Sequence, residues 1–172
     1  MDSIYMKSAI AEAEKAYAEG ETPVGAVIVR DGGIIASAHN MTERLNDSTA
    51  HAELLAIQAA EKATGDRRLT GCALYVTMEP CPMCAGAIIN ARIKTVYFGA
   101  FDPKAGSCGS MINLFSLPYN HQPELVSGLM EEECAEELRT FFRELRKQRK
   151  LIRKAQKFAS DAGDDPQTVS GE

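Results

Sequence analysis

The sequence predicts an α/β protein, a three-layer α/β/α sandwich with a central mixed sheet of about five strands. Two observations favour this class. Short β-rich apolar runs alternate with segments of helical periodicity through the middle of the chain. In addition, residues 73–99 have the pattern of a strand, a helix and a strand, for which a right-handed parallel crossover is the usual connection.

The first part of the chain predicts a helix, a hairpin and a second helix. Apolar residues at helical spacing indicate a helix over residues 3–19. Asp31-Gly32 is a strong turn signal between two β-rich runs, so residues 24–38 predict a hairpin. A polar loop follows, and either Ser48 or Thr49 can cap the next helix.

The second part alternates strand and helix before a long final helix. Residues 73–78 and 94–99 are β-rich, and a short helix is expected between them, with Pro82 in its favourable first turn. A loop-rich stretch then leads to a weak strand. The remaining predicted elements are one helical turn near 111–115, a strand at 124–126 and a helix at 130–156.

The length and charge distribution indicate one domain with a basic end. The chain has 172 residues, which suits a single buried domain over residues 1–158, with a disordered polar tail over 159–172. The net charge of −5 hides an asymmetry, because residues 139–157 hold nine basic residues and one acid. An anionic partner would explain this segment, and so would a solvated amphipathic helix.

Composition also favours a cytoplasmic protein without a membrane partner. Residues 1–10 lack the pattern of a secretion signal, and the longest apolar runs are only as long as a strand. The five cysteines therefore favour a metal or catalytic role over a disulfide framework.

The most informative motif pairs His51-Ala52-Glu53 with Cys81 and Cys84. One imidazole and two thiolates are three good zinc ligands, and a catalytic zinc site keeps its fourth position for water. A carboxylate at Glu53 would then move protons beside that water. The two cysteines alone would also fit a redox dithiol or half of a structural zinc site, but their pairing with His51 and Glu53 favours catalytic zinc.

The spacing of these residues is compatible with one shared site. Cys81 and Cys84 are three residues apart at the start of a predicted helix, so both sulfurs lie on one helix face. His51 and Glu53 are expected at the start of the other helix. Two helix N-termini meeting at one site would favour thiolates and stabilise a developing oxyanion.

The chain resembles the zinc-dependent nucleoside and nucleobase deaminases, and more narrowly the bacterial tRNA-specific adenosine deaminases. The wider signature is His-x-Glu followed by Pro-Cys-x-x-Cys, which stands here at 51–53 and 80–84. The narrower resemblance extends from about Tyr5 to Lys157. The segments that carry it are 22–27, 51–53, 74–87, 98–106 and 141–143.

This resemblance implies a cytidine deaminase-like fold, one Zn²⁺ per subunit, a homodimer, and hydrolytic deamination of the wobble adenosine in the anticodon loop of tRNA. It implies that His51, Cys81 and Cys84 bind zinc and that Glu53 is the catalytic proton shuttle. It also implies substrate-binding residues: Asn40 and the Ala52 backbone N–H at the purine, Pro23 and Val24 at the pocket wall, Asp102 and Lys104 near the flipped base, and Phe142 and Arg143 at the anticodon loop.

Two rival functions share most of these residues. A small-molecule deaminase of guanine, cytosine or a nucleoside would use the same zinc chemistry without needing the basic segment. A non-catalytic zinc module would have no use for Glu53. Single residues also have structural explanations, because Asn40 suits an Asx turn, Asp102-Pro103 suits a turn, and Lys104 suits a solvated loop.

Overall fold

The computed structural model describes residues 2–162, with side chains up to residue 157. The chain divides into two compact units, Met1–Leu138 and Arg139–Glu172. The expected extent of the domain, 1–158, stays a prediction, and most of the expected tail lies outside the described residues. No helix in the described part of the chain is both long and apolar enough to cross a membrane.

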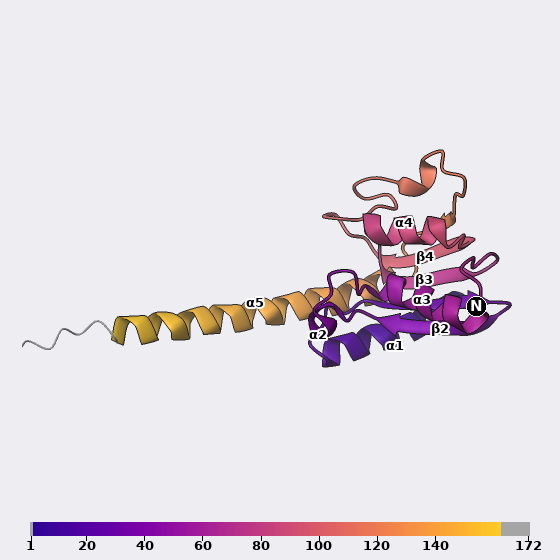
Figure 1. The fold of residues 1–172 in the computed structure, drawn as a ribbon. Helices are drawn as coiled ribbons and strands as arrows, with labels where there is room; N and C mark the ends of the chain where they lie inside the picture. Colours follow the sequence, from indigo (N-terminus) through magenta and orange to yellow (C-terminus); the bar gives the residue numbers. More distant parts are fainter. Residues whose placement is uncertain (1, 163–172) are drawn as a thin grey trace, which may run out of the picture. The chain divides into compact units, whose positions relative to one another are not determined.

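The first unit is built on one five-stranded mixed sheet (Figure 1). Its strand order is β2-β1-β3-β4-β5, with β1 antiparallel to both β2 and β3, and with β3, β4 and β5 parallel. The strands are β1 (Gly25–Arg30), β2 (Gly33–His39), β3 (Ala73–Met78), β4 (Thr95–Ala100) and β5 (Glu124–Val126). The predicted mixed sheet is therefore confirmed.

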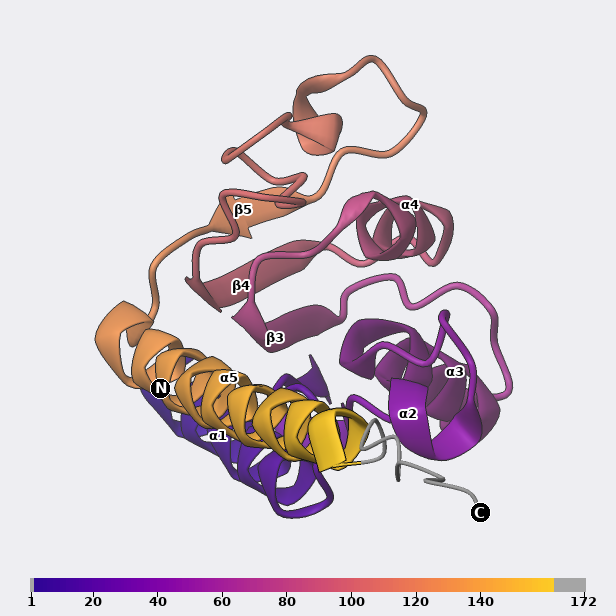
Figure 2. The same cartoon turned by 90° about the vertical axis from the view of Figure 1, so that its left-hand side faces the viewer.

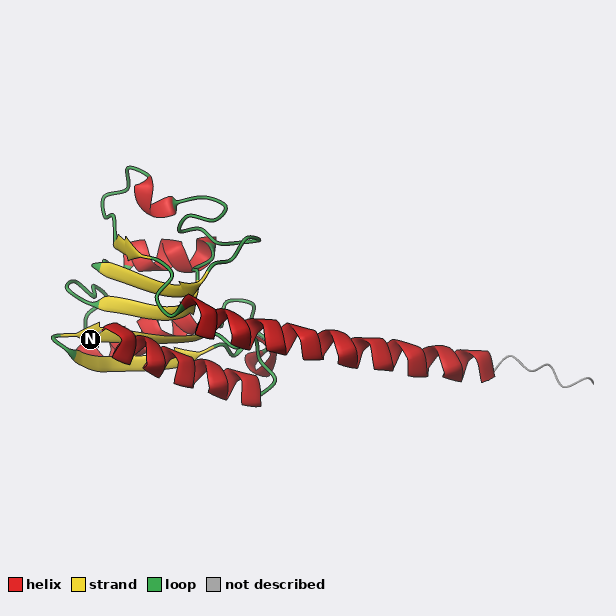
Figure 3. Cartoon of the chain, turned by 180° about the vertical axis from the view of Figure 1, so that it is seen from behind, coloured by secondary structure: helices red, strands yellow, loops and turns green. Residues whose placement is uncertain are grey.

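Helices cover both faces of this sheet and make three layers (Figure 2). On one face lies α1 (Asp2–Ala18), joined by residues 131–138 of α5 (Glu131–Ala162), where Cys134 lies against Gly99. On the other face lie α3 (Ala52–Thr64) and α4 (Pro82–Asn90). Viewed from behind, α1 and the first turns of α5 lie in front of the strands (Figure 3).

The central strands are apolar because both of their faces are covered. Residues 26–28 of β1 and 74–76 of β3 are almost fully buried, as is Phe98 of β4. A strand covered on both faces has a continuous apolar run instead of an alternating one. Local composition therefore predicted these strands almost to the residue.

The predicted hairpin turn is also present. Asp31 and Gly32 both have positive φ, 50° and 78°, as the tight turn between β1 and β2 requires. Glycine adopts such a φ without steric cost, and aspartate is one of the few other residues that tolerate it.

The structure corrects the predicted start of the second helix. Helix α3 begins at Ala52 with His51 as its N-cap, and neither Ser48 nor Thr49 caps it. Thr49 instead donates both its backbone N–H and its hydroxyl to the Asp47 carboxylate, at 2.8 and 2.7 Å. This local turn occupies the hydroxyl that would have capped the helix.

The predicted loop 40–48 contains a short helix, α2 (Thr42–Leu45). The fully buried carboxylate of Glu21 accepts hydrogen bonds from the Thr42 hydroxyl and from the backbone N–H groups of Glu43 and Arg44, at 3.2, 3.2 and 2.7 Å. These are the N–H groups that a helix start leaves without partners. Their acceptor comes from a distant segment, so local patterns did not predict α2.

Two further boundaries differ slightly. The predicted helical turn near 111–115 is a 3₁₀ turn at Leu114–Ser116, and α5 continues past residue 156 to Ala162.

The strand order and directions bring four strand termini to the same end of the sheet. The parallel strands β3 and β4 both end there, at Met78 and Ala100, which pair with each other. Because β1 is antiparallel to β3, it begins at this end, and β2 ends there, with Gly25 paired to His39. Helices α3 and α4 also begin at this end of the sheet. The functional residues predicted within the first unit lie at or next to these strand ends and helix starts.

Candidate active site and metal centre

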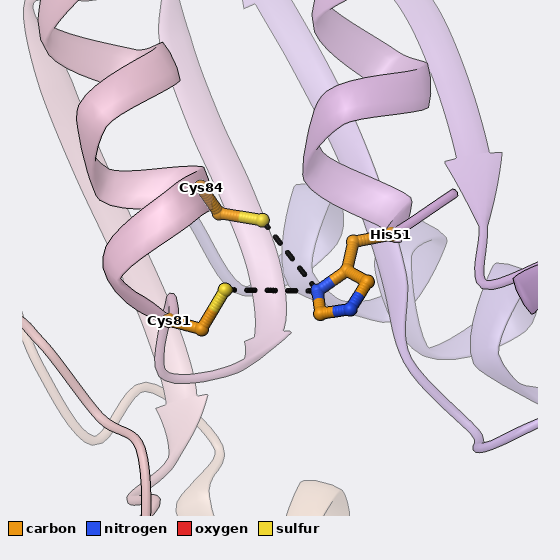
Figure 4. Close-up of side chains that lie close together, drawn as sticks. All are labelled: His51, Cys81 and Cys84. Carbon is orange, nitrogen blue, oxygen red and sulfur yellow. Dashed lines mark hydrogen bonds between the residues drawn. The ribbon is translucent and has the colours of Figure 1, made fainter. Parts of the chain in front are cut away.

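The three predicted metal ligands lie at the starts of α3 and α4 (Figure 4). His51 is the N-cap of α3 and Cys81 is the N-cap of α4, both with extended backbone. Cys84 lies in the first turn of α4, so its sulfur is on the same side as that of Cys81. The two helix N-termini thus meet at one site, as the sequence predicted.

The distances among these side chains match a tetrahedral zinc site. His51 Nδ1 lies 3.7 Å from the Sγ atom of Cys81 and 3.7 Å from that of Cys84. Zinc bonds of about 2.3 Å to sulfur and about 2.1 Å to nitrogen place the two ligand atoms roughly 3.6 Å apart in a tetrahedron. Among the described residues, these three form the one group of His, Cys, Asp or Glu side chains close enough to share an ion. The cluster therefore fits a zinc ion.

Electrostatics within the cluster favour a cation. Hydrogen bonds from the Cys84 thiol and the His51 ring outweigh burial and lower the pKa of the Cys81 thiol to about 4. The pKa of Cys84 is raised, because its thiol donates to Cys81 and is buried near the Glu53 carboxylate. A divalent metal would stabilise both thiolates at once, so metal binding releases protons here.

Glu53 lies beside the cluster but is not part of it. Its side chain is buried, 3% exposed, and it lines the adjacent cavity. Burial raises the pKa of Glu53 to about 7, and the nearby Cys81 contributes in the same direction. A carboxyl group with such a pKa can both accept and donate a proton near neutral pH, as an acid-base catalyst must.

The cavity beside the cluster has a volume of about 260 Å³ and collects residues from all four strand ends. Three of the predicted substrate-binding residues line it: Val24, Asn40 and Asp102. Ala52 is buried, and its backbone N–H donates to Asn40 Oδ1 at 3.3 Å. Pro23 is buried and Lys104 is exposed, and neither of them belongs to the cavity lining.

Several lining residues were missed by sequence reasoning. They are Thr22, Thr42, Met78, Glu79 and Ala105. Most of them are next to a predicted site residue or motif in the sequence. This proximity could have identified them. Thr42 had no such signal, because it enters the cavity with the unpredicted helix α2.

Phe142 and Arg143 lie in the second unit, on α5. Phe142 is 39% exposed and packs edge-to-face with Phe141, while Arg143 donates to the Thr140 hydroxyl at 3.1 Å. Further along the helix, four basic side chains line a shallow cavity on one face: Arg146, Arg149, Lys150 and Arg153. The contacts of Phe142 and Arg143 with RNA stay predictions.

An α/β/α sandwich whose helix starts present a His-Cys-Cys cluster beside a buried glutamate is the architecture of a zinc-dependent deaminase. Residues 1–100 match the family described as the cytidine and deoxycytidylate deaminase zinc-binding region. The tRNA-specific adenosine deaminase of Bacillus subtilis (strain 168) is 56% identical over 154 residues, which are 89% of this chain and 96% of that protein. The chain belongs to this deaminase family, and within it to the tRNA-specific adenosine deaminases.

Solved structures agree with this assignment. A tRNA:A34 deaminase from a study of A-to-I editing at the wobble position superposes with a TM-score of 0.76 at 50% identity, covering 78% of this chain and 98% of that one. A guanine deaminase from Bacillus subtilis superposes with a TM-score of 0.57 at 38% identity, covering 72% and 82%.

Proposed function

We propose that the protein converts the wobble adenosine of a tRNA anticodon to inosine by hydrolytic deamination. The observation that carries this proposal is the small cavity that ends at the His51–Cys81–Cys84 cluster with buried Glu53 beside it, in a chain 56% identical to a tRNA-specific adenosine deaminase. Ligand pockets usually measure about 300 to 1,000 Å³. The cavity, at about 260 Å³, lies just below this range and is large enough for a single base.

In this proposal His51, Cys81 and Cys84 hold one zinc ion per subunit, which activates water as a Lewis acid when bound. Glu53 takes a proton from the water and delivers protons to the purine ring and to the departing amine. Its burial supports this role, because the loss of water raises the pKa of a carboxyl group and so lets it act first as base and then as acid.

The remaining cavity residues position the base. Asn40 lines the cavity, and its side-chain amide is oriented by the hydrogen bond that it accepts from Ala52. We assign recognition of the purine to the Asn40 NH₂ group, which the Ala52 backbone N–H orients through Asn40 Oδ1. We assign the wall beside the purine to Val24 and the neighbouring Pro23. Asp102 at the cavity and Lys104 near it are assigned to the nucleotides that flank the flipped base.

A cavity of this size admits a base only after the base leaves its stack. Unstacking costs least in a single-stranded loop, which favours an anticodon loop over duplex RNA. We assign contacts with this loop to Phe142 and Arg143, and phosphate contacts to the basic face at Arg146, Arg149, Lys150 and Arg153. The local excess of positive charge at 139–157 supports this assignment.

The decisive experiment offers the purified zinc-loaded protein an anticodon stem-loop with adenosine at the wobble position. Free adenosine, cytidine and guanine are tested beside it, and a stem-loop with adenosine one position away serves as the matched RNA. We expect inosine in the first RNA alone. Preferential conversion of a free base would contradict the proposal.

Salt dependence tests the RNA-binding face separately from the chemistry. For each side chain that neutralises a phosphate, its removal should reduce the slope of log affinity against log salt by about 0.7 to 0.9. Replacing Arg149 and Arg153 by alanine should therefore weaken RNA binding and flatten the slope, while turnover at saturating RNA stays near the parent value. An unchanged slope would remove this face from the RNA-binding surface.

We also propose a cytoplasmic homodimer, as in the family that the sequence resembles. A groove along α4 with a mixed apolar and polar lining supports self-association. Its lining residues are Pro82, Gly86, Ile89, Asn90, Leu114, Tyr119 and Asn120. The mass of one chain is 18.7 kDa, and light scattering should give twice this value. A monomer at micromolar concentration would exclude the dimer.

A guanine deaminase is the second candidate function. It is favoured by the 38% identity to the guanine deaminase of Bacillus subtilis, whose fold superposes on this chain. The free guanine in the substrate panel tests it directly, because this candidate requires that guanine be converted faster than the RNA.

A further inference from the structure

Glu79 is a buried carboxylate to which neither the sequence motifs nor the proposed function assigns a role. It lies between the end of β3 and the Pro80-Cys81 step that enters α4, and it is 3% exposed. It also lines the cavity. A buried carboxylate persists only where hydrogen bonds compensate for the loss of water.

The hydrogen bonds to the Glu79 side chain come from one loop, residues 101–110. Glu79 Oε2 accepts from the backbone N–H of Asp102 at 3.0 Å, and Oε1 accepts from the N–H groups of Cys108 and Ser110, both at 3.0 Å. The Ser110 hydroxyl also donates to Oε2. Three backbone N–H groups and one hydroxyl of the loop thus surround the two oxygens of this carboxylate.

Backbone hydrogen bonds also join the Glu79-Pro80 segment to the end of β4 and to the 101–110 loop. The Glu79 N–H donates to Ala100 O at 2.8 Å, and Ser107 donates its N–H to Pro80 O at 2.9 Å. Gly106 packs so closely on the carboxylate that a Cβ atom there would overlap Glu79 Oε2. The loop is therefore fitted around this one side chain.

The same loop carries Asp102 and Ala105, which line the cavity, and Lys104, whose N–H donates to Asp102 Oδ1 at 2.9 Å. The chain continues from Glu79 directly through Pro80 to Cys81. Glu79 thus joins the turn that leads to Cys81 to the loop that carries Asp102 and Ala105.

We propose that Glu79 is a positioning residue, which fixes the 101–110 loop at a set distance from the metal cluster and so holds Asp102 ready for the nucleotides beside the flipped base. We call the hydrogen bonds between Glu79 and the 101–110 loop the clamp. The inference rests on the proposed function for its substrate, but the geometry of the clamp does not depend on that function. Glu79 acts through the loop and takes no part in proton transfer.

The substitution Glu79→Gln separates the parts of the clamp. Glutamine keeps one acceptor oxygen, which can serve Cys108 and Ser110, but it places an NH₂ group opposite the Asp102 N–H. Amide hydrogen exchange should therefore accelerate about tenfold or more at Asp102, and less at Cys108. Zinc content should stay at the parent level. This measurement needs no substrate, so it decides the clamp even if the proposed function fails.

A double-mutant cycle with Asp102→Ala tests what the clamp is for. In the parent, Glu79→Gln should lower kcat/KM for the stem-loop about tenfold, mainly through KM. In the Asp102→Ala background the same change should cost less than about threefold, because the group being positioned is already gone. If the parent prefers a free base, the cycle is run with that base.

Glu21→Gln is the matched control, because Glu21 is equally buried and holds the neighbouring α2 start by three hydrogen bonds. The change in kcat/KM that Glu21→Gln causes should be the same in the parent and in the Asp102→Ala background. Equal costs of Glu79→Gln in both backgrounds, or an unchanged exchange rate at Asp102, would overturn the proposal. Should Glu79→Gln fail to fold, Glu79→Asp keeps the charge but shortens the reach to the loop, and it must still accelerate exchange at Asp102.

Discussion

Asn40 Oδ1 accepts a hydrogen bond at 3.3 Å from the backbone N–H of Ala52, the first residue of the helix that carries Glu53. Two groups that the sequence assigned to substrate binding are thus bonded to each other. The bond orients the Asn40 amide, so that its NH₂ group is the part left to donate to a base in the cavity.

Replacing Asn40 should separate these two roles. Asn40→Ala removes both, whereas Asn40→Asp keeps the acceptor for Ala52 and loses the donor for the purine. We expect both variants to lower kcat/KM by about 10- to 100-fold, since an unmet buried hydrogen bond costs about 1–3 kcal/mol. Steady-state kinetics on the stem-loop measures this. Near-parent activity of Asn40→Asp would mean that Asn40 is only a turn residue.

Glu53→Gln should abolish turnover without removing the metal. Glutamine has nearly the same shape but does not exchange a proton, and acid-base catalysis typically contributes about 10²- to 10⁴-fold in rate. The variant should bind zinc and RNA like the parent, because Glu53 lies outside the ligand cluster. Metal analysis and inosine formation are the two measurements, and inosine formation within about tenfold of the parent would refute the assigned role.

Cys84→Ala should lose zinc, and with it some stability. Loss of a ligand opens the site, and the roughly 2–3 kcal/mol of stabilisation that the metal no longer supplies would lower the Tm by about 5–10 °C in a chain of this size. Cys72→Ala is the matched control, because Cys72 is also fully buried but lies directly before β3, outside the cluster. It should keep its zinc. Full zinc occupancy in Cys84→Ala would contradict the ligand assignment.

Glu137 should make the protein less stable as the pH rises. Burial, reinforced by the nearby Glu14, raises the pKa of Glu137 from 4.5 to about 7, and one of its carboxyl oxygens is buried without a hydrogen-bond partner among the described residues. The folded chain therefore holds this proton more tightly than the unfolded chain does. Its contribution to stability is complete below about pH 4.5 and is lost as the pH rises through about 7.

Glu137→Gln stays neutral at every pH and should remove this dependence. Urea unfolding at pH values of about 5, 7 and 8.5 should show the variant gaining stability over the parent as the pH rises. Glu133→Gln makes the same change at an exposed position one turn earlier and should show no such gain. A pH-independent difference between Glu137→Gln and the parent would exclude the effect.

Local patterns determined much of the fold. The strands at 73–78 and 124–126 match their predicted bounds. The first lies in an apolar run that suits a strand covered on both faces, and the second, which is mostly exposed, is a short edge strand. The spacing of Cys81 and Cys84 placed both sulfurs on one helix face, and Pro82 marked the start of α4. The start of α3 was predicted too early, at Ser48 or Thr49 instead of His51.

The tertiary structure decided which segments share the cavity. Thr42 and Glu79 line the cavity because the strand order β2-β1-β3-β4-β5 brings four strand termini to the same end of the sheet. That order depends on long-range pairing, which local periodicity does not encode.

The sequence by itself thus determined the longer helices, most strands and the metal-binding pattern, because each depends on residues within a few positions of one another. The loops around the cavity were decided only in three dimensions. Their backbone N–H groups find acceptors on two distant buried carboxylates, Glu21 for the start of α2 and Glu79 for the 101–110 loop. A loop takes its conformation from such partners, and the partners become its neighbours only when the chain is folded.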